Sequence, residues 1–140
     1  MHLAFYTGTR KGFHGLLNRA VRWWTRGPFS HVELVFSDGL AASASGVDHG
    51  VRFKDIQFDL ARWVLVPIDG DEAQSRDWFK ANLGKGYDYL GLFGFLWRPY
   101  NGERDRFFCS EAVALALGYP EGWRFDPNTL AAVARMRSDK

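Results

Sequence analysis

The sequence predicts an α+β fold in which an antiparallel sheet in the N-terminal half packs against helices. Up to about residue 68, apolar and polar residues mostly alternate, as they do in strands with one buried face. From residue 71 onward the apolar residues recur at helical spacing. No repeat or Pro/Ser-rich linker interrupts the chain, so we expect residues 1–140 to form a single domain.

The first half contains one helix among its strands. "GFHGLLNRAVRWWTRG" (12–27) has apolar residues at helical spacing and ends at Gly27-Pro28. Asp38-Gly39 predicts a hairpin turn between two of the strands. The strand candidates are "LAFYTG" (3–8), "HVELVF" (31–36), "LAASAS" (40–45), "GVRFKDI" (50–56) and "RWVLVPI" (62–68).

The second half is predicted to be mainly helical. Asp126 suits an N-cap, and Pro127 suits the first helical position, where its missing N–H group is not needed. The helix candidates are "DEAQSRDWFKANLG" (71–84), "YDYLGLFGFLW" (87–97), "CSEAVALALG" (109–118) and "DPNTLAAVARM" (126–136).

Composition restricts the class of protein. Apolar residues make up 46% of the chain and aromatic residues 16%, which excludes an intrinsically disordered protein. One cysteine cannot form an internal disulfide, and neither a signal peptide nor a run long enough to span a membrane is visible. We therefore expect a soluble protein, cytoplasmic by default.

Positive charge is concentrated near the N-terminus, where no acidic residue precedes Glu33. Arg19, Arg22 and Arg26 share one flank of the predicted helix, beside two tryptophans, and suit either a contact with an anionic surface or a solvated face. Neither a metal-ligand spacing nor a phosphate-binding loop is present, so we expect no metal, no cofactor and no specific nucleic-acid partner.

Cys109 is the first candidate for chemistry. It is placed at the start of an apolar helix, where unpaired N–H groups and the helix dipole stabilise a thiolate. The alternative is a buried, inert core residue, since Phe107 and Phe108 precede it.

A cysteine nucleophile needs a base, and histidine is the usual one. His31 is the best of the four candidates because it opens a predicted strand directly after the turn-rich "RGPFS", whereas the others are terminal, early in the basic helix or in a loop. A histidine without a catalytic role is the alternative.

Taken together, "SHVELVFSDG", "GYDYLGLFGF" and "FFCSEAV" resemble the circularly permuted branch of the NlpC-type papain-like cysteine peptidases. That branch includes the YiiX-like hydrolases and the lecithin:retinol acyltransferase-like enzymes. In the unpermuted family the cysteine helix precedes the histidine strand; here His31 precedes Cys109.

The resemblance implies that Cys109 is the nucleophile, that His31 is the base, and that the Cys109 N–H group contributes to an oxyanion hole. It implies that Tyr87 lines the substrate cleft. The family's third polar residue falls near Ser43; because serine is a poor orienter of histidine, Ser43 is expected to bind substrate instead. Glu33 lies on the same strand face as His31 and is our candidate for the third member, the alternative being an exposed acid paired to an arginine.

The resemblance further implies a thiol hydrolase that cleaves an amide bond, in a peptidoglycan stem peptide or a small peptide, through an acyl-enzyme. A lipid acyltransferase or esterase of the same fold and a non-catalytic binding or assembly module are the alternatives. Without a signal peptide, a cell-wall substrate requires release by lysis or injection, for which a phage or prophage origin is a hypothesis.

Overall fold

The computed structural model describes residues 1–89 and 105–138. The predicted helix over 87–97 lies mostly outside the described residues, and its first residue, Tyr87, belongs to a strand instead.

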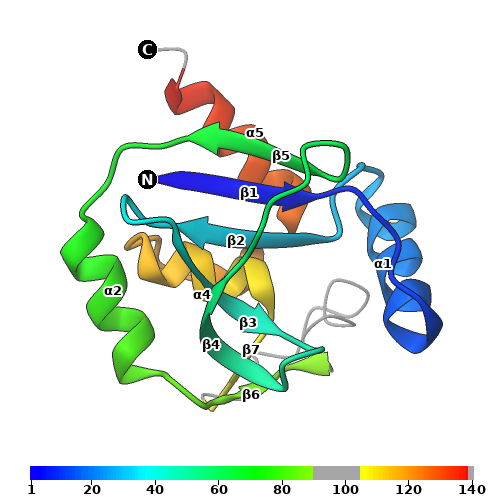
Figure 1. Ribbon diagram of the computed structural model, residues 1–140, viewed down its shortest axis with the longest axis horizontal. Coiled ribbons are helices and arrows are strands. Elements are labelled where there is room, and N and C mark those ends of the chain that lie inside the picture. The colour runs from blue at the N-terminus through cyan, green and yellow to red at the C-terminus, as the bar shows by residue number, and fades with distance from the viewer. Residues whose placement is uncertain (90–104, 139–140) are drawn as a thin grey trace.

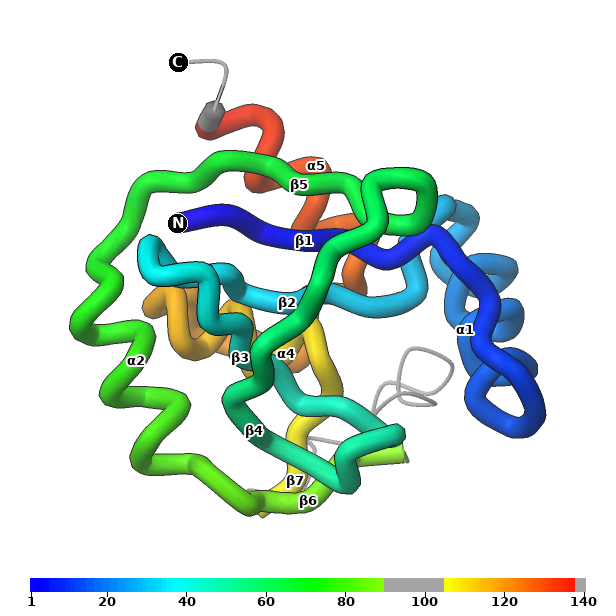
Figure 2. Tube along the Cα trace, in the orientation of Figure 1, coloured from blue at the N-terminus to red at the C-terminus, as the bar shows by residue number. Residues whose placement is uncertain are grey.

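The N-terminal half forms a five-stranded antiparallel sheet in the order β4-β3-β2-β1-β5 (Figure 1), which confirms the α+β prediction. β1 lies between β2 and β5 because the connection over 56–62 crosses one face of the sheet before β5 begins (Figure 2). The strands are β1 (His2–Tyr6), β2 (His31–Val35), β3 (Leu40–Ser45), β4 (Gly50–Asp55) and β5 (Trp63–Pro67).

The helices surround this sheet. In Figure 1, α4 and α5 lie behind it, while α1 and α2 stand at opposite ends. The Asp126 cap is confirmed, because its carboxylate accepts the N–H groups of Asn128 and Thr129 at 2.8 and 3.0 Å. The described helices are α1 (Gly12–Thr25), α2 (Glu72–Ala81), α4 (Cys109–Ala116), the short 3-10 helix η1 (Gly122–Arg124) and α5 (Pro127–Ser138).

Buried side chains cover both faces of the sheet. The larger cluster joins β1 and β2, through residues such as Phe5 and Leu34, to Val113 of α4 and Leu130 of α5. On the other face, the 56–62 connection packs Ile56 and Phe58 against a smaller cluster that contains Trp63. Both faces are thus shielded from water, as the burial of all five residues of β2 requires.

A second, two-stranded sheet positions the start of α4. β6 (Gly86–Tyr87) pairs in parallel with β7 (Arg106–Phe107), and Cys109 follows two residues later. The sequence did not predict these strands, because two-residue strands carry no detectable periodicity. Among the described residues, none of the helices is long and apolar enough to cross a bilayer.

Candidate active site around Cys109 and His31

Cys109 is the first residue of α4 and is almost completely buried, with 1% of its surface exposed. The preceding residue, Phe108, packs against Val21 and Leu17 of α1 and against Tyr87. This packing anchors the start of the helix, where the first backbone N–H groups have no acceptor within the helix. The thiol therefore lies where a negative charge is stabilised.

His31 is the first residue of β2 and is 7% exposed. Ser30, directly before it, is fixed by its N–H group, which donates to the Tyr6 carbonyl at 3.0 Å, and by its hydroxyl, which accepts from Asn18 at 3.1 Å. The Cys109 side chain lies close enough to His31 to raise the pKa of its imidazole. The structure thus brings together two residues that are 78 positions apart in the sequence.

Glu33 is the second partner of His31. Its Oε1 lies 2.7 Å from the imidazole Nε2, and its side chain has no exposed surface. Strand alternation places the two side chains on one face of β2, as expected from the sequence. Because Glu33 occupies Nε2, Nδ1 is the ring nitrogen left for the thiol.

Arg52 of β4 holds Glu33 through two hydrogen bonds. Its two terminal nitrogens donate to Oε2 at 2.7 Å and to Oε1 at 2.6 Å. Arg52 is itself held by Asp48 at 2.9 Å, and Asp48 also pairs with Lys54 at 2.9 Å. Side chains of alternating charge therefore extend from His31 to the surface. Their hydrogen bonds fix the Glu33 carboxylate against the imidazole.

The electrostatics favour a charged imidazole. Burial by itself lowers the pKa of His31, but the negative charges and hydrogen bonds of Cys109 and Glu33 more than offset it and raise that pKa to about 9. Burial raises the pKa of Glu33, whereas hydrogen bonds from Arg52 and the charge of His31 lower it to about 2. Glu33 is therefore ionised throughout the physiological range, and His31 is protonated whenever Cys109 is a thiolate.

Tyr87 lies in the crevice beside His31, together with residues of α1 that include His14, Asn18 and Val21. Burial and the negative charge of Cys109 raise the pKa of Tyr87 well above its usual value, so its phenol stays neutral and able to donate a hydrogen bond. The crevice encloses only about 40 Å³, room for about one water molecule.

Ser43 occupies a different position from the one expected for a substrate-binding residue. It is completely buried, and its hydroxyl donates to the Val32 carbonyl at 2.7 Å. It does not line the crevice. Because the hydroxyl already donates to the main chain of the sheet and is fully buried, neither a substrate nor His31 can bind it.

The three arginines predicted to share a flank, Arg19 and Arg22 of α1 and Arg26 directly after it, do not form one surface. Arg22 donates to the carbonyl oxygens of Thr7 and Gly8 and to the hydroxyl of Thr9, which ties α1 to the end of β1. Arg19 and Arg26 are exposed. Of the three arginines expected to contact an anionic surface, only Arg19 and Arg26 are therefore available to do so.

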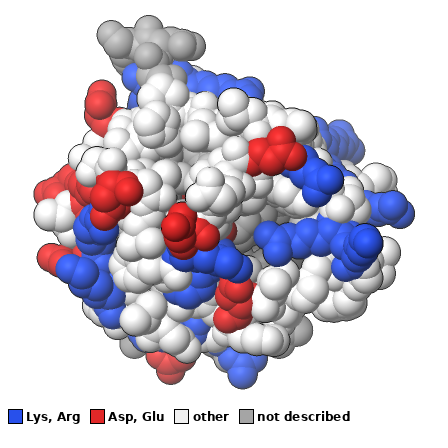
Figure 3. All heavy atoms as spheres, viewed as in Figure 1, with Lys and Arg blue, Asp and Glu red and all other residues white. Residues whose placement is uncertain are grey.

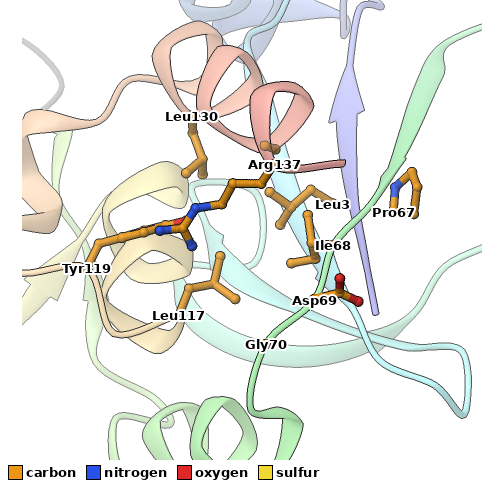
Figure 4. A pocket seen from close by; sticks show the side chains of 10 residues that line it. Leu3, Pro67, Ile68, Asp69, Gly70, Leu117, Tyr119, Leu130 and Arg137 are labelled. Atoms are coloured by element: carbon orange, nitrogen blue, oxygen red, sulfur yellow. The ribbon is translucent and has the colours of Figure 1, made fainter. Parts of the chain in front are cut away.

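A larger cavity of about 320 Å³ lies elsewhere, beside the C-terminal end of α4 (Figure 4). Its wall combines apolar side chains, such as Leu3 and Leu130, with Asp69 and with Arg137, whose guanidinium stacks over the Tyr119 ring at 5.0 Å. Cys109 begins the same helix, roughly 12 Å away at 1.5 Å per residue. We therefore assign this cavity no part in the thiol site.

Arg52 and Asn18 are the residues of this site that sequence reasoning missed. The sequence analysis allowed for an arginine paired with Glu33 but did not identify it. Arg52 comes close to Glu33 only through the register of β3 with β4, which a sequence pattern does not show. Asn18 lies inside a helix among apolar residues, and its polar side chain at a buried helical position was the available signal.

Comparison of the chain with protein-family models, curated proteins and solved structures finds no match. Over the part of the chain that the structure describes, no group of three histidine, cysteine or acidic side chains is arranged to hold a metal ion.

Proposed function

We propose that this protein is a thiol hydrolase with a permuted papain-like arrangement, in which Cys109 is the nucleophile, His31 the base and Glu33 the residue that orients His31. One observation carries the proposal: a buried imidazole lies between a thiol at a helix N-terminus and a buried carboxylate. The hydrogen bonds from Arg52 to Glu33 support the proposal, because a carboxylate fixed by an arginine keeps the imidazole it contacts in one orientation.

In the proposed reaction, His31 takes the proton of the Cys109 thiol and Sγ attacks a carbonyl carbon. The carbonyl oxygen becomes an oxyanion beside the free N–H groups at the start of α4. Collapse of this intermediate breaks the C–N bond, and His31 donates the proton to the leaving amine. His31 then takes a proton from water, which attacks the thioester and releases the acid and the thiol.

The substrate class rests on the family resemblance, which favours an amide bond in a peptidoglycan stem peptide or a small peptide. A lipid ester is the second candidate, favoured by the exposed aromatic side chains of α1, the helix that lines the crevice. In either case the crevice must widen, because about 40 Å³ does not admit a peptide or an acyl chain.

The first experiment is alkylation of native Cys109 by iodoacetamide across a pH series. In the wild type we expect alkylation below neutral pH to be faster than that of a free thiol, because the imidazolium stabilises the thiolate. His31→Ala should slow it at that pH. His14→Ala is the matched control, since His14 lines the same crevice but is not part of the proposed Cys109–His31 pair.

If both histidine variants are alkylated like the wild type, the thiol and the imidazole do not work as a pair and the proposal fails. Alkylation that is slow in all three proteins, despite a native fold, would instead indicate a binding module with an inert, buried thiol.

A further inference from the structure

Helix α1 has two apolar faces, and only one of them is buried; on the other, the Phe13 ring touches Tyr89 at 6.4 Å between centroids but stays largely exposed. The inward face carries Val21 and Leu17, which contact Phe108 and Tyr87. The outward face carries Phe13, Leu16 and Trp23, whose exposed fractions are 62%, 64% and 77%. A helix on the surface of a globular domain ordinarily has a polar outward face, so an apolar stripe of this size indicates an interaction site.

The three residues belong to one stripe. Phe13, Leu16, Ala20 and Trp23 follow one another at intervals of three or four residues, the spacing that aligns side chains along one side of a helix. Trp24, which is 41% exposed, adjoins the stripe through ring contact with Trp23 at 6.0 Å. We call these five residues the α1 stripe.

The charge beside the stripe has a single sign. Arg19 lies on the flank of the α1 stripe, Arg26 directly follows the last residue of the helix, and Lys11 directly precedes the first; all three are exposed. No acidic residue occurs before Glu33. On the face shown in Figure 3, basic but no acidic side chains border the part of the molecule where α1 lies, whereas the opposite side mixes both signs.

From these observations we infer that the α1 stripe docks the protein on an anionic lipid surface, with α1 lying in the plane of the interface. Phenylalanine, leucine and tryptophan would enter the boundary between headgroups and acyl chains, and Arg19, Arg26 and Lys11 would contact lipid phosphates. The inward face stays packed on the protein, so docking requires no rearrangement of the fold. The inference does not depend on thiol chemistry.

The test is cosedimentation with vesicles of equal parts phosphatidylcholine and phosphatidylglycerol, compared with vesicles of phosphatidylcholine alone. We expect stronger binding to the anionic vesicles, weakened by added salt. Leu16→Glu should lower the partition coefficient by about tenfold or more, because it removes a leucine that docking would bury in lipid and adds a negative charge. Leu60→Glu is the matched control, since Leu60 is 75% exposed but lies in the 56–62 connection.

A second pair of variants tests the charge. Arg19→Gln with Arg26→Gln should weaken binding to the anionic vesicles by up to about thirtyfold, because each basic residue near an anionic surface contributes about 1 kcal/mol. Arg62→Gln with Lys80→Gln removes the same charge from two side chains that are each 66% exposed and lie outside α1, and should change binding less. Cys109→Ala should bind like the wild type, which separates this inference from the proposed enzymatic function.

Three outcomes would overturn the inference: no sedimentation with anionic vesicles, equal sedimentation with both vesicle types, or equal losses for Leu16→Glu and Leu60→Glu. Self-association that Leu16→Glu abolishes, without any vesicle binding, would assign the stripe to a second copy of the chain instead.

Discussion

Two neighbours of His31 raise the pKa of its imidazole, and each has a different consequence for its chemistry. In the proposed reaction Cys109 supplies the proton that His31 takes, whereas the Glu33 carboxylate lies 2.7 Å from Nε2 of the ring. A carboxylate at that position stabilises the imidazolium that forms when the thiol ionises. Glu33 in turn remains ionised in a fully buried site because Arg52 neutralises it.

Glu33→Gln should separate these effects. Loss of the carboxylate charge should lower the pKa of His31 from about 9, and should destabilise the fold by about 3 kcal/mol because Arg52 loses a buried partner. A proton NMR titration of the His31 ring, together with urea unfolding, measures both. Asp48→Asn is the control, because Asp48 contacts Arg52 but is not among the groups that shift His31. A His31 titration that moves in Asp48→Asn and not in Glu33→Gln would contradict this account.

The same pair sets a pH window for stability. The folded-state pKa of His31 is above its ordinary value, so its contribution is complete below about pH 6.5 and is lost as the pH rises through about 9. The folded-state pKa of Glu33 is depressed, so its contribution is complete above about pH 4.5 and is lost as the pH falls toward 2. Both contributions are complete together only between about pH 4.5 and about pH 6.5.

At the scale of elements, the start of α4 is shaped by Glu111 as well as by Cys109. Glu111 accepts a hydrogen bond from the Phe108 N–H group, as the third residue of a capping box does. It is nevertheless 7% exposed, and one of its oxygens has no hydrogen-bond partner among the described residues. Burial and the nearby charge of Asp88 outweigh that hydrogen bond and raise its pKa to about 7.

Glu111 should therefore make the protein less stable as the pH rises. The unfolded chain releases this proton near pH 4.5 and the folded chain near pH 7, so the Glu111 contribution falls across that interval. Glu111→Gln keeps the capping acceptor without the charge, and should be more stable than the wild type at pH 8 by an amount on the order of a few kcal/mol. Urea unfolding at pH 5 and pH 8 measures it; an equal difference between the two proteins at both pH values would refute it.

At the scale of the whole molecule, the residues of the candidate site come from two sheets, which meet beside Gly50. The main sheet carries His31 and Glu33, whereas β6 and β7 lead into Cys109. The two meet where the Val51 N–H group donates to the Lys85 carbonyl at 2.8 Å, directly beside Gly50. Gly50 has a φ of 143°, and a Cβ atom there would overlap the Lys85 carbonyl.

Gly50→Ala should therefore disturb the spacing between Cys109 and His31 as well as stability. We expect slower alkylation of Cys109 below neutral pH and a loss of stability greater than the roughly 1 kcal/mol typical of alanine at a positive φ. Gly39→Ala is the matched control, because Gly39 has a φ of 87° but open space around it. If the two variants lose equal stability and keep wild-type alkylation, the close approach at Gly50 does not position the site.

The sequence by itself determined two features that depend on local pattern, the α+β class and the Asp126 cap, and it offered Cys109, His31 and Glu33 as site candidates. Periodicity and capping involve residues within one or two turns of each other, so they can be recognised without a fold. Strand alternation likewise placed Glu33 beside His31.

Only the tertiary structure decided which long-range partners meet. It placed β1 between β2 and β5, brought Arg52 to Glu33, buried Ser43 within the sheet and used Arg22 to tie α1 to β1. The outward exposure of Phe13, Leu16 and Trp23 was equally beyond the sequence, because helical spacing defines a stripe but not what covers it. Strand order and register are set by the packing of the entire core, and no short segment of the chain encodes them.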